Sequence, residues 1–201
     1  MEKTKKKENT NIHPDKLKSL WKNLKGEQNV IGFYSHNSTN PYPSFSNFYQ
    51  HSPFPFTIPS WCGSMANMHV DIDFSEKAIM LCKSSLMGDS ETFIKILNAK
   101  TPQQAKKLGR QVTPFDDTIW KNNVCQIAKE VITCKFMKVE GLAKILLSTE
   151  DSLIAEATTR DKFWGIGINT NHNDVSYPER WKGNNILGWA LMEARNTLNS
   201  Y

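Results

Sequence analysis

Cysteine is scarce in this sequence, and its few copies are not spaced for disulfides or for metal binding. The 201 residues include four cysteines, with no CxxC pair among them. Cys82 and Cys125 fall within apolar helical patterns, where a thiol acts as a small buried hydrophobic group. The sequence therefore favours reduced, buried thiols, which are typical of a cytoplasmic protein, with a nuclear location as the alternative.

Long apolar runs and clustered histidines are also missing. No run approaches the roughly 20 residues of a membrane-spanning helix, and the N-terminal segment MEKTKKKENT has no apolar stretch of the kind found in secretory signals. The five histidines, at positions 13, 36, 51, 69 and 172, are scattered along the chain. We therefore expect no membrane association, no metal site and no cofactor.

The net charge of +5 comes entirely from the start of the chain. Residues 1–25 hold eight lysines against three acidic residues, and the remaining residues balance at 17 basic and 17 acidic. We predict a disordered basic tail over residues 1–13, which either is solvated or contacts nucleic acid nonspecifically. The folded body should be close to electrically neutral.

An apolar content of 39% over this length is enough for one domain with a real core. We predict a single α+β domain over residues 14–201, mainly helical with a small β-sheet. It should open with an amphipathic helix that docks through Leu17, Leu20, Trp21 and Leu24. The expected helices are 14–25, 75–87, 90–98, 102–108, 117–138, 140–148 and 185–198, and the expected strands are 30–34, 54–58, 66–72 and 153–157.

The chain is organised around the helix predicted at residues 75–87. Glu76 and Lys83 lie seven residues apart, so they share one stripe about two turns, roughly 10 Å, apart. A cation and an anion at this separation could hold two ends of one ligand. The competing interpretation is local: Asp73 as N-cap and Glu76 three residues later approximate a capping box.

Aromatic side chains gather in a segment that is otherwise rich in serine, asparagine and proline. Residues 35–60 contain six of them, Tyr42, Phe45, Phe48, Tyr49, Phe54 and Phe56. Such a loop could line a pocket for a base and a sugar, or its rings could only seal one end of the core. Trp120, offset from the buried stripe of the helix at 117–138 that includes Ile119, has the same two interpretations.

Several short motifs, weak alone but ordered along residues 30–198, resemble the NADAR family. They are the pair Phe33-Tyr34, SNFY at 46–49, Ser75-Glu76 with Lys83, the segment 99–110 that ends in Gly109-Arg110, LIAEA at 153–157, DKFWGIG at 161–167, and the segments 181–188 and 191–195. The sequence departs from the family where aromatic residues usually follow the glutamate, because Ala78, Ile79 and Met80 stand there.

The resemblance implies an N-glycosidase that acts on ribosyl or ADP-ribosyl substrates. The implied substrates are ADP-ribosylated guanine, free or in nucleic acid, and phosphoribosylated intermediates of riboflavin synthesis. Breaking the bond between C1′ and nitrogen builds positive charge on the sugar, which a carboxylate stabilises. The implied partner is therefore a small ribosyl substrate, with ADP-ribosylated DNA as an alternative, and we expect a monomer.

The resemblance also suggests roles for individual residues. Glu76 would stabilise the ribosyl cation and activate water, and Asp161 would assist it or bind the ribose. The candidate substrate-binding residues are Asn47, Phe48, Lys83, Arg110, Trp120, Trp164 and Gly165. Lys83 and Arg110 would hold phosphate, and the two tryptophans would bound the base. The departures after Glu76 leave a second hypothesis open, a non-catalytic module that binds NAD or ADP-ribose.

Overall fold

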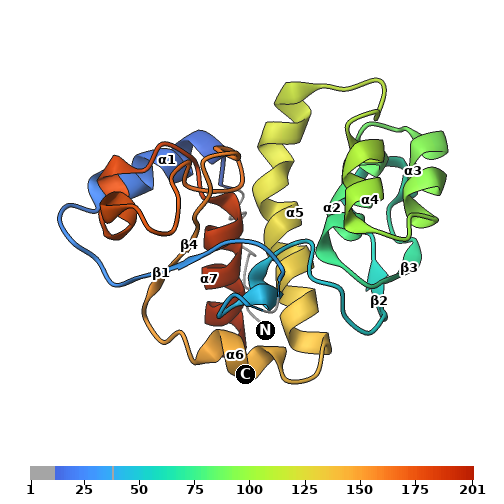
Figure 1. Cartoon of the computed structure of the whole chain (residues 1–201). Coiled ribbons are helices and arrows are strands. Elements are labelled where there is room, and N and C mark those ends of the chain that lie inside the picture. Colours follow the sequence, from blue (N-terminus) through green and yellow to red (C-terminus); the bar gives the residue numbers. More distant parts are fainter. Residues whose placement is uncertain (1–11, 38) are drawn as a thin grey trace, which may run out of the picture.

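The computed structural model describes residues 12–37 and 39–201 and has a mainly helical α+β fold (Figure 1). The predicted fold class is therefore confirmed. The helices are α1 (Pro14–Asn23), α2 (Ser75–Leu86), α3 (Ser90–Leu97), α4 (Pro102–Gly109), α5 (Asp117–Lys138), α6 (Leu142–Leu147) and α7 (Ile186–Leu198). The strands are β1 (Val30–Phe33), β2 (Phe54–Thr57), β3 (His69–Ile72) and β4 (Leu153–Glu156). Most boundaries lie within one or two residues of those predicted.

The strands form two separate pairs and not the one small sheet that we predict from the sequence. β1 pairs with β4 in parallel, with Phe33 opposite Glu156, and β2 pairs with β3 in an antiparallel hairpin. In Figure 1 the two pairs lie on either side of α5. Helices thus fill the space between the two strand pairs. The apolar pattern of the strands therefore predicts that they are buried against helices, but it does not predict that they share one sheet.

The core is built around α5, which packs along α7 and α2 (Figure 1). Val124, Ile127 and Val131 have no exposed surface. The expectation that Ile119 belongs to this buried stripe is wrong, because its side chain is 42% exposed and Trp120 is buried instead. In Figure 1 the first turn of α5 extends beyond α7, and the Trp120 ring lies beside α2, with the Lys83 ammonium 5.6 Å from the centre of the ring.

Helix α1 docks where expected, although not through every predicted residue. Leu17 is fully buried, and Trp21 donates a hydrogen bond from Nε1 to the carbonyl of Asn184 at 2.7 Å. Leu20 is 42% exposed and does not contribute as predicted. The imidazole of His13 caps this helix by accepting the N–H of Asp15. Most of the predicted basic tail, residues 1–11, lies outside the described residues.

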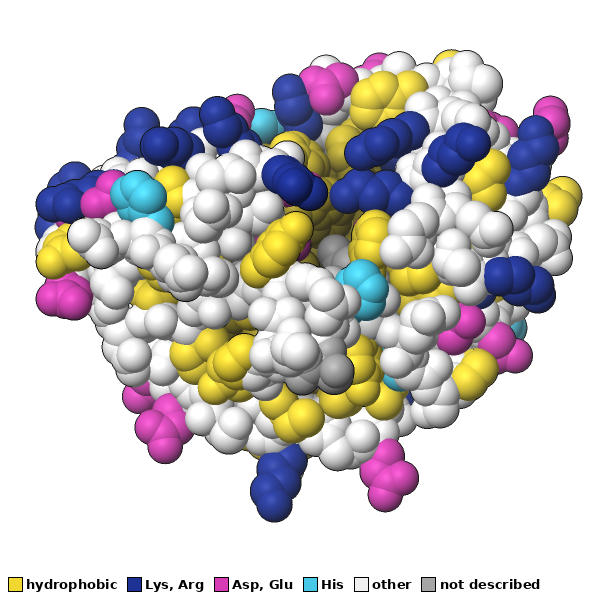
Figure 2. All heavy atoms as spheres, in the orientation of Figure 1, with side chains coloured by type: hydrophobic (Ala, Val, Ile, Leu, Met, Phe, Trp, Pro, Cys, Tyr) yellow, Lys and Arg dark blue, Asp and Glu magenta, His cyan; other side chains and the backbone are white. Residues whose placement is uncertain are grey.

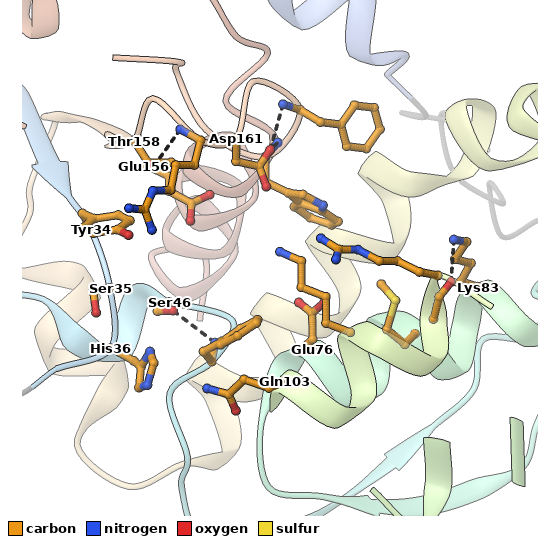
Figure 3. A pocket seen from close by; sticks show the side chains of 18 of the residues that line it. Tyr34, Ser35, His36, Ser46, Glu76, Lys83, Gln103, Glu156, Thr158 and Asp161 are labelled. Atoms are coloured by element: carbon orange, nitrogen blue, oxygen red, sulfur yellow. Dashed lines mark hydrogen bonds between the residues drawn. The ribbon is translucent and has the colours of Figure 1, made fainter. Parts of the chain in front are cut away.

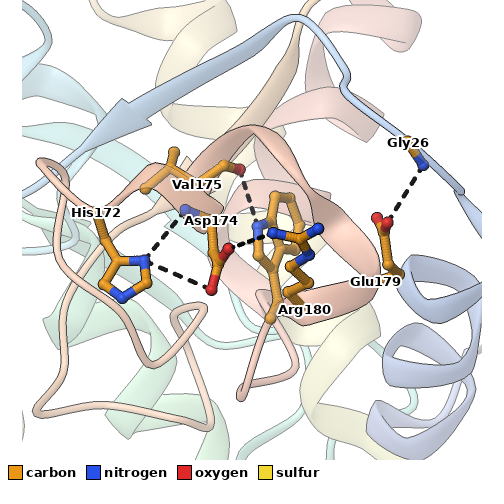
Figure 4. Close-up of polar contacts among 7 residues, drawn as sticks. Gly26, His172, Asp174, Val175, Glu179 and Arg180 are labelled. Carbon is orange, nitrogen blue, oxygen red and sulfur yellow. Dashed lines mark hydrogen bonds and ion pairs between the residues drawn. The ribbon is translucent and has the colours of Figure 1, made fainter.

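A polar network fixes the segment that leads from β4 to α7 (Figure 4). The Arg180 guanidinium donates to Asp174 at 2.8 Å, and Trp181 Nε1 donates to the carbonyl of Val175 at 2.9 Å. Glu179 accepts the N–H of Gly26 at 3.2 Å, which joins this segment to the end of α1. The network therefore holds the N-terminal helix and the entry to α7 together.

The cysteines in the described part of the chain carry free thiols, and Cys62, Cys82 and Cys125 are buried. Within residues 12–37 and 39–201, no helix combines the length and the apolar character needed to cross a bilayer.

Candidate active site

A cavity of about 610 Å³ opens between the α2–α4 half of the molecule and the end of the β1–β4 pair. Figure 2 shows the surface hollowed there, with Lys and Arg side chains on both sides of the opening. In Figure 3, Glu76 rises from α2 while Glu156 and Asp161 reach in from the facing side. The cavity thus brings Glu76 together with two carboxylates that lie 80 and 85 residues later in the sequence.

Glu76 lies in the first turn of α2 and is only 5% exposed. Its backbone N–H donates to the carbonyl of Asn47 at 3.0 Å. The predicted capping box is absent, because Phe74 occupies the N-cap position and Asp73 forms an ion pair with Lys77 at 2.8 Å. Burial raises the pKa of the Glu76 carboxyl to about 7, and nearby Lys106 opposes that rise. Glu76 can therefore gain or lose a proton near neutral pH.

Glu156, which we did not select from the sequence, is the second acid of the cavity. It is the last residue of β4, and Asn185 Oδ1 accepts its backbone N–H at 3.1 Å. Its Oε2 atom is buried, and no described residue hydrogen-bonds it. Burial raises the pKa of Glu156 to about 8, and the negative charge of Asp161 adds to the rise. A carboxyl in this state is mainly protonated at neutral pH and can donate a proton.

Asp161 borders the same cavity but already has a structural task. Its Oδ1 atom accepts the backbone N–H groups of Phe163 at 2.9 Å and Trp164 at 2.8 Å. These bonds shape the turn that carries Trp164 into the cavity wall. Both hydrogen bonds are accepted by Oδ1, so the other carboxylate oxygen of Asp161 can face a ligand.

Four cations line the cavity beside the three acids, and they are Lys83, Lys106, Arg110 and Arg160. Lys83 donates from Nζ to the carbonyl of Gly109 at 2.7 Å and lies 4.4 Å from the centre of the Phe115 ring. Burial lowers the pKa of Lys83, while Glu76 partly offsets this effect. Four cations face three acids, and Glu156 is mainly protonated at neutral pH, so the cavity carries net positive charge and suits an anionic ligand.

Aromatic rings form the remaining walls. Trp120 is buried at 7% exposure and also lines the cavity, so it belongs both to the core and to the cavity wall. Phe48 and Trp164 are partly buried, and the ammonium of Lys106 lies 5.4 Å from the Phe48 ring centre. Such rings can stack on a flat base.

A sequence profile of the NADAR domain matches residues 32–199, which is most of the chain. The chain belongs to the NADAR family.

Individual relatives agree with this assignment. An N-glycosidase of Acanthamoeba polyphaga mimivirus is 39% identical over 122 residues, covering 60% of this chain and 71% of that protein. The chloroplastic riboflavin biosynthesis protein PYRR of Zea mays is 28% identical over 177 residues, covering 86% of this chain but 26% of that longer protein. The solved structure of E. coli YbiA superposes with a TM-score of 0.63 at 26% identity, covering 87% of this chain and 88% of YbiA.

Two residues that the NADAR resemblance suggested for substrate binding do not line the cavity. Asn47 is buried and supports Glu76 through its backbone carbonyl. Gly165 is buried against the end of β4, where an added Cβ would lie 2.5 Å from the carbonyl oxygen of Glu156. Asn47 thus supports Glu76 through its backbone, and Gly165 packs closely on the strand end that carries Glu156.

The NADAR cavity also contains residues that the sequence did not single out as site residues. Besides Glu156, these include Tyr34, His36, Met80, Gln103, Lys106, Arg160 and Phe163. The sequence did carry a signal for Glu156, because this acid is the last residue of the otherwise apolar strand LIAE. No group of His, Cys, Asp and Glu within residues 12–37 and 39–201 is arranged to hold a metal ion.

Proposed function

We propose that this protein hydrolyses the N-glycosidic bond of a phosphorylated ribosyl or ADP-ribosyl substrate. The observation that carries the proposal is the pair Glu76 and Glu156, two acids of one cavity whose pKa values burial raises to about 7 and about 8. A glycosidic bond to nitrogen requires both a proton for the departing base and negative charge beside the sugar. Two acids with different proton affinities meet these needs.

The two acids have complementary roles in this reaction. Glu156 donates a proton to the base as the bond from C1′ to nitrogen breaks and its electron pair moves onto the base. Glu76, as the carboxylate, stabilises the cationic sugar and takes a proton from the water that bonds to C1′. Asp161 accepts a hydrogen bond from a ribose hydroxyl through its second oxygen.

The rest of the cavity supplies recognition. Arg110, Lys106 and Arg160 bind the phosphate groups, because guanidinium and ammonium groups form charge-assisted hydrogen bonds to phosphate oxygens. Trp120, Trp164 and Phe48 stack on the base or on adenine. Lys83 keeps its bond to Gly109 and adds positive charge at the edge of the phosphate site.

The names of the relatives support a glycosidase, and two classes of candidate substrate follow from the family resemblance. Relatives in a mimivirus and in Nostoc punctiforme are called N-glycosidases, and plant relatives are called riboflavin biosynthesis proteins. ADP-ribosylated guanine and phosphoribosylated riboflavin precursors both carry an N-glycosidic ribose and phosphate. Both compounds therefore belong in the first assay.

The test measures release of free base by mass spectrometry from each compound. Glu76→Gln should fold and bind but lose about a thousandfold in turnover, since it can no longer accept a proton or become charged. Glu91→Gln is the matched control, because Glu91 is exposed on α3 and pairs with Lys95. Wild-type turnover by Glu76→Gln would refute the catalytic role of Glu76.

Calorimetry with ADP-ribose, together with the base-release assay, distinguishes the glycosidase hypothesis from the hypothesis of a non-catalytic binding module. Saturable binding by the wild type without release of any base, over the whole substrate panel, would support the module and contradict the glycosidase.

A further inference from the structure

Lys135 is a buried cation on α5, outside the cavity. Its side chain has no exposed surface. Its Nζ donates to the backbone carbonyl of Ser44 at 2.5 Å and to that of Ser46 at 3.0 Å. The rings of Tyr49 and Phe136 lie 5.5 and 5.4 Å away, and no ion pair joins Lys135 to a carboxylate of residues 12–37 or 39–201. Backbone carbonyls and aromatic faces thus surround this ammonium.

An unpaired buried ammonium is costly, because it loses its hydration without gaining an opposite charge. The cost is visible in the pKa of Lys135, which burial lowers to about 7. A methionine at this position would fill similar space without that cost, but it would take the hydrogen-bond donor away from the carbonyls of Ser44 and Ser46. These two effects oppose each other, so the net contribution of Lys135 to global stability should be small.

The segment that Lys135 holds forms part of the cavity wall. Ser46 and Phe48 line the cavity, and Ser46 Oγ accepts the N–H of Phe48 at 3.1 Å. Between them, the Asn47 carbonyl accepts the N–H of Glu76 at 3.0 Å. A continuous series of hydrogen bonds and peptide units thus runs from the Lys135 ammonium to the first turn of α2.

We propose that Lys135 is a positioning residue, which holds residues 44–48 from behind and thereby fixes Phe48 and Glu76 in the cavity. Lys135 touches neither substrate nor water in the reaction. Its catalytic consequence rests on the proposed function, whereas its effect on the order of the wall does not. The site depends on α5 even though α5 contributes only Trp120 to the lining.

The test compares Lys135→Met with Lys138→Met. Lys138 lies on the same helix and also donates to a backbone carbonyl, that of Pro55 at 2.6 Å, but it is exposed and away from the cavity. Hydrogen exchange should quicken about tenfold in the peptide containing residues 44–48 and at the amide of Glu76 in Lys135→Met only. Its melting temperature should stay close to that of the wild type, because relief of the buried charge offsets the lost hydrogen bonds, whereas a merely structural role would lower it.

With a substrate that the wild type cleaves, kcat of Lys135→Met should fall at least about tenfold, because small displacements of a catalytic group are expensive. Lys135→Gln provides a second variant with a shorter neutral donor, and it should show the same localised exchange. Unchanged exchange in both Lys135 variants, or loss of the whole fold in both, would overturn the positioning role. If the wild type cleaves nothing, the proposed function fails, and the exchange experiment still decides the role of Lys135.

Discussion

Asn185 and Glu156 are joined by a buried side-chain bridge at the end of β4. Asn185 Oδ1 accepts the N–H of Glu156 at 3.1 Å, and its Nδ2 donates to the carbonyl of Ile154 at 2.8 Å. The asparagine is fully buried and has a φ of 54°, in the left-handed region that asparagine tolerates better than most residues. One amide therefore acts as the strand partner that β4 lacks on this side, and it orients the strand end that carries Glu156.

We expect Asn185→Ala to lower the free energy of unfolding by about 2–4 kcal/mol, because two buried backbone groups lose their partners. Urea unfolding measures this loss. Asn123→Ala is the control, since Asn123 also bonds a backbone carbonyl, that of Ile119 at 2.8 Å, but on an exposed helix surface. Its cost should be below about 1 kcal/mol. Equal costs for the two variants would contradict the structural role of the bridge.

Stability should depend on pH through Glu156. Burial raises its folded-state pKa from 4.5 to about 8, so the folded chain keeps a proton that the unfolded chain releases between these values. The free energy of unfolding should therefore fall as pH rises from about 5 to 8, at up to about 1.4 kcal/mol per pH unit for this group. Glu156→Gln cannot titrate and should show a shallower slope in urea unfolding over this range. Glu91→Gln, at an exposed site, should keep the wild-type slope.

Phosphate recognition can be tested on α4. Arg110 lines the cavity just after this helix, whereas Lys107 is exposed on the same helix and does not. Arg110→Gln should raise KM for a phosphorylated substrate about tenfold or more, because it removes charge-assisted hydrogen bonds. The same variant should leave KM for a dephosphorylated analogue nearly unchanged. An equal rise in KM for Lys107→Gln would indicate a general charge effect in place of a phosphate site.

Close packing of α4 on α2 depends on Gly109. A Cβ at this position would lie 2.0 Å from Met80 Sδ, so Gly109→Ala should push the helices apart and cost about 1–3 kcal/mol. Shortening the opposing side chain should relieve this clash. The double variant Gly109→Ala with Met80→Ala should therefore lose less stability than the two single losses combined, as a double-mutant cycle in urea would show. Additive losses would rule out direct contact as the cause.

The helices could be predicted from the sequence because their signals are local. Thr101 and Pro102 mark the start of α4, and the side chain of Thr101 caps it as expected. The division of the strands into two pairs could not be predicted, because the partner of β1 lies far along the chain and periodicity carries no pairing information. The helix that carries Glu76 could be predicted from the sequence. The burial of its carboxyl could not, because the surrounding cavity is built by segments from both halves of the molecule.

The missed residues share a physical reason. Glu156 and Lys135 are charged side chains in regular elements, and charged residues are usually exposed. Only the packed structure shows that Glu156 faces a cavity and that Lys135 meets two backbone carbonyls. For Trp120 the sequence left two alternatives, the core or a pocket wall, because a large ring beside a buried stripe is expected to pack against one or the other.

The parallel pairing of β1 with β4 has a consequence for synthesis of the protein on the ribosome. Asn29 and Ser152, which bond to each other beside this pair, are 123 residues apart. A nascent chain that has emerged up to the end of α5 already contains Glu76. It still lacks β4, which is the strand partner of β1 and carries Glu156. Long-range pairing of this kind is slow to form and delays completion of a domain. The two acids can therefore meet only after β4 has emerged, so nascent chains that end before β4 should lack the cavity with its paired acids.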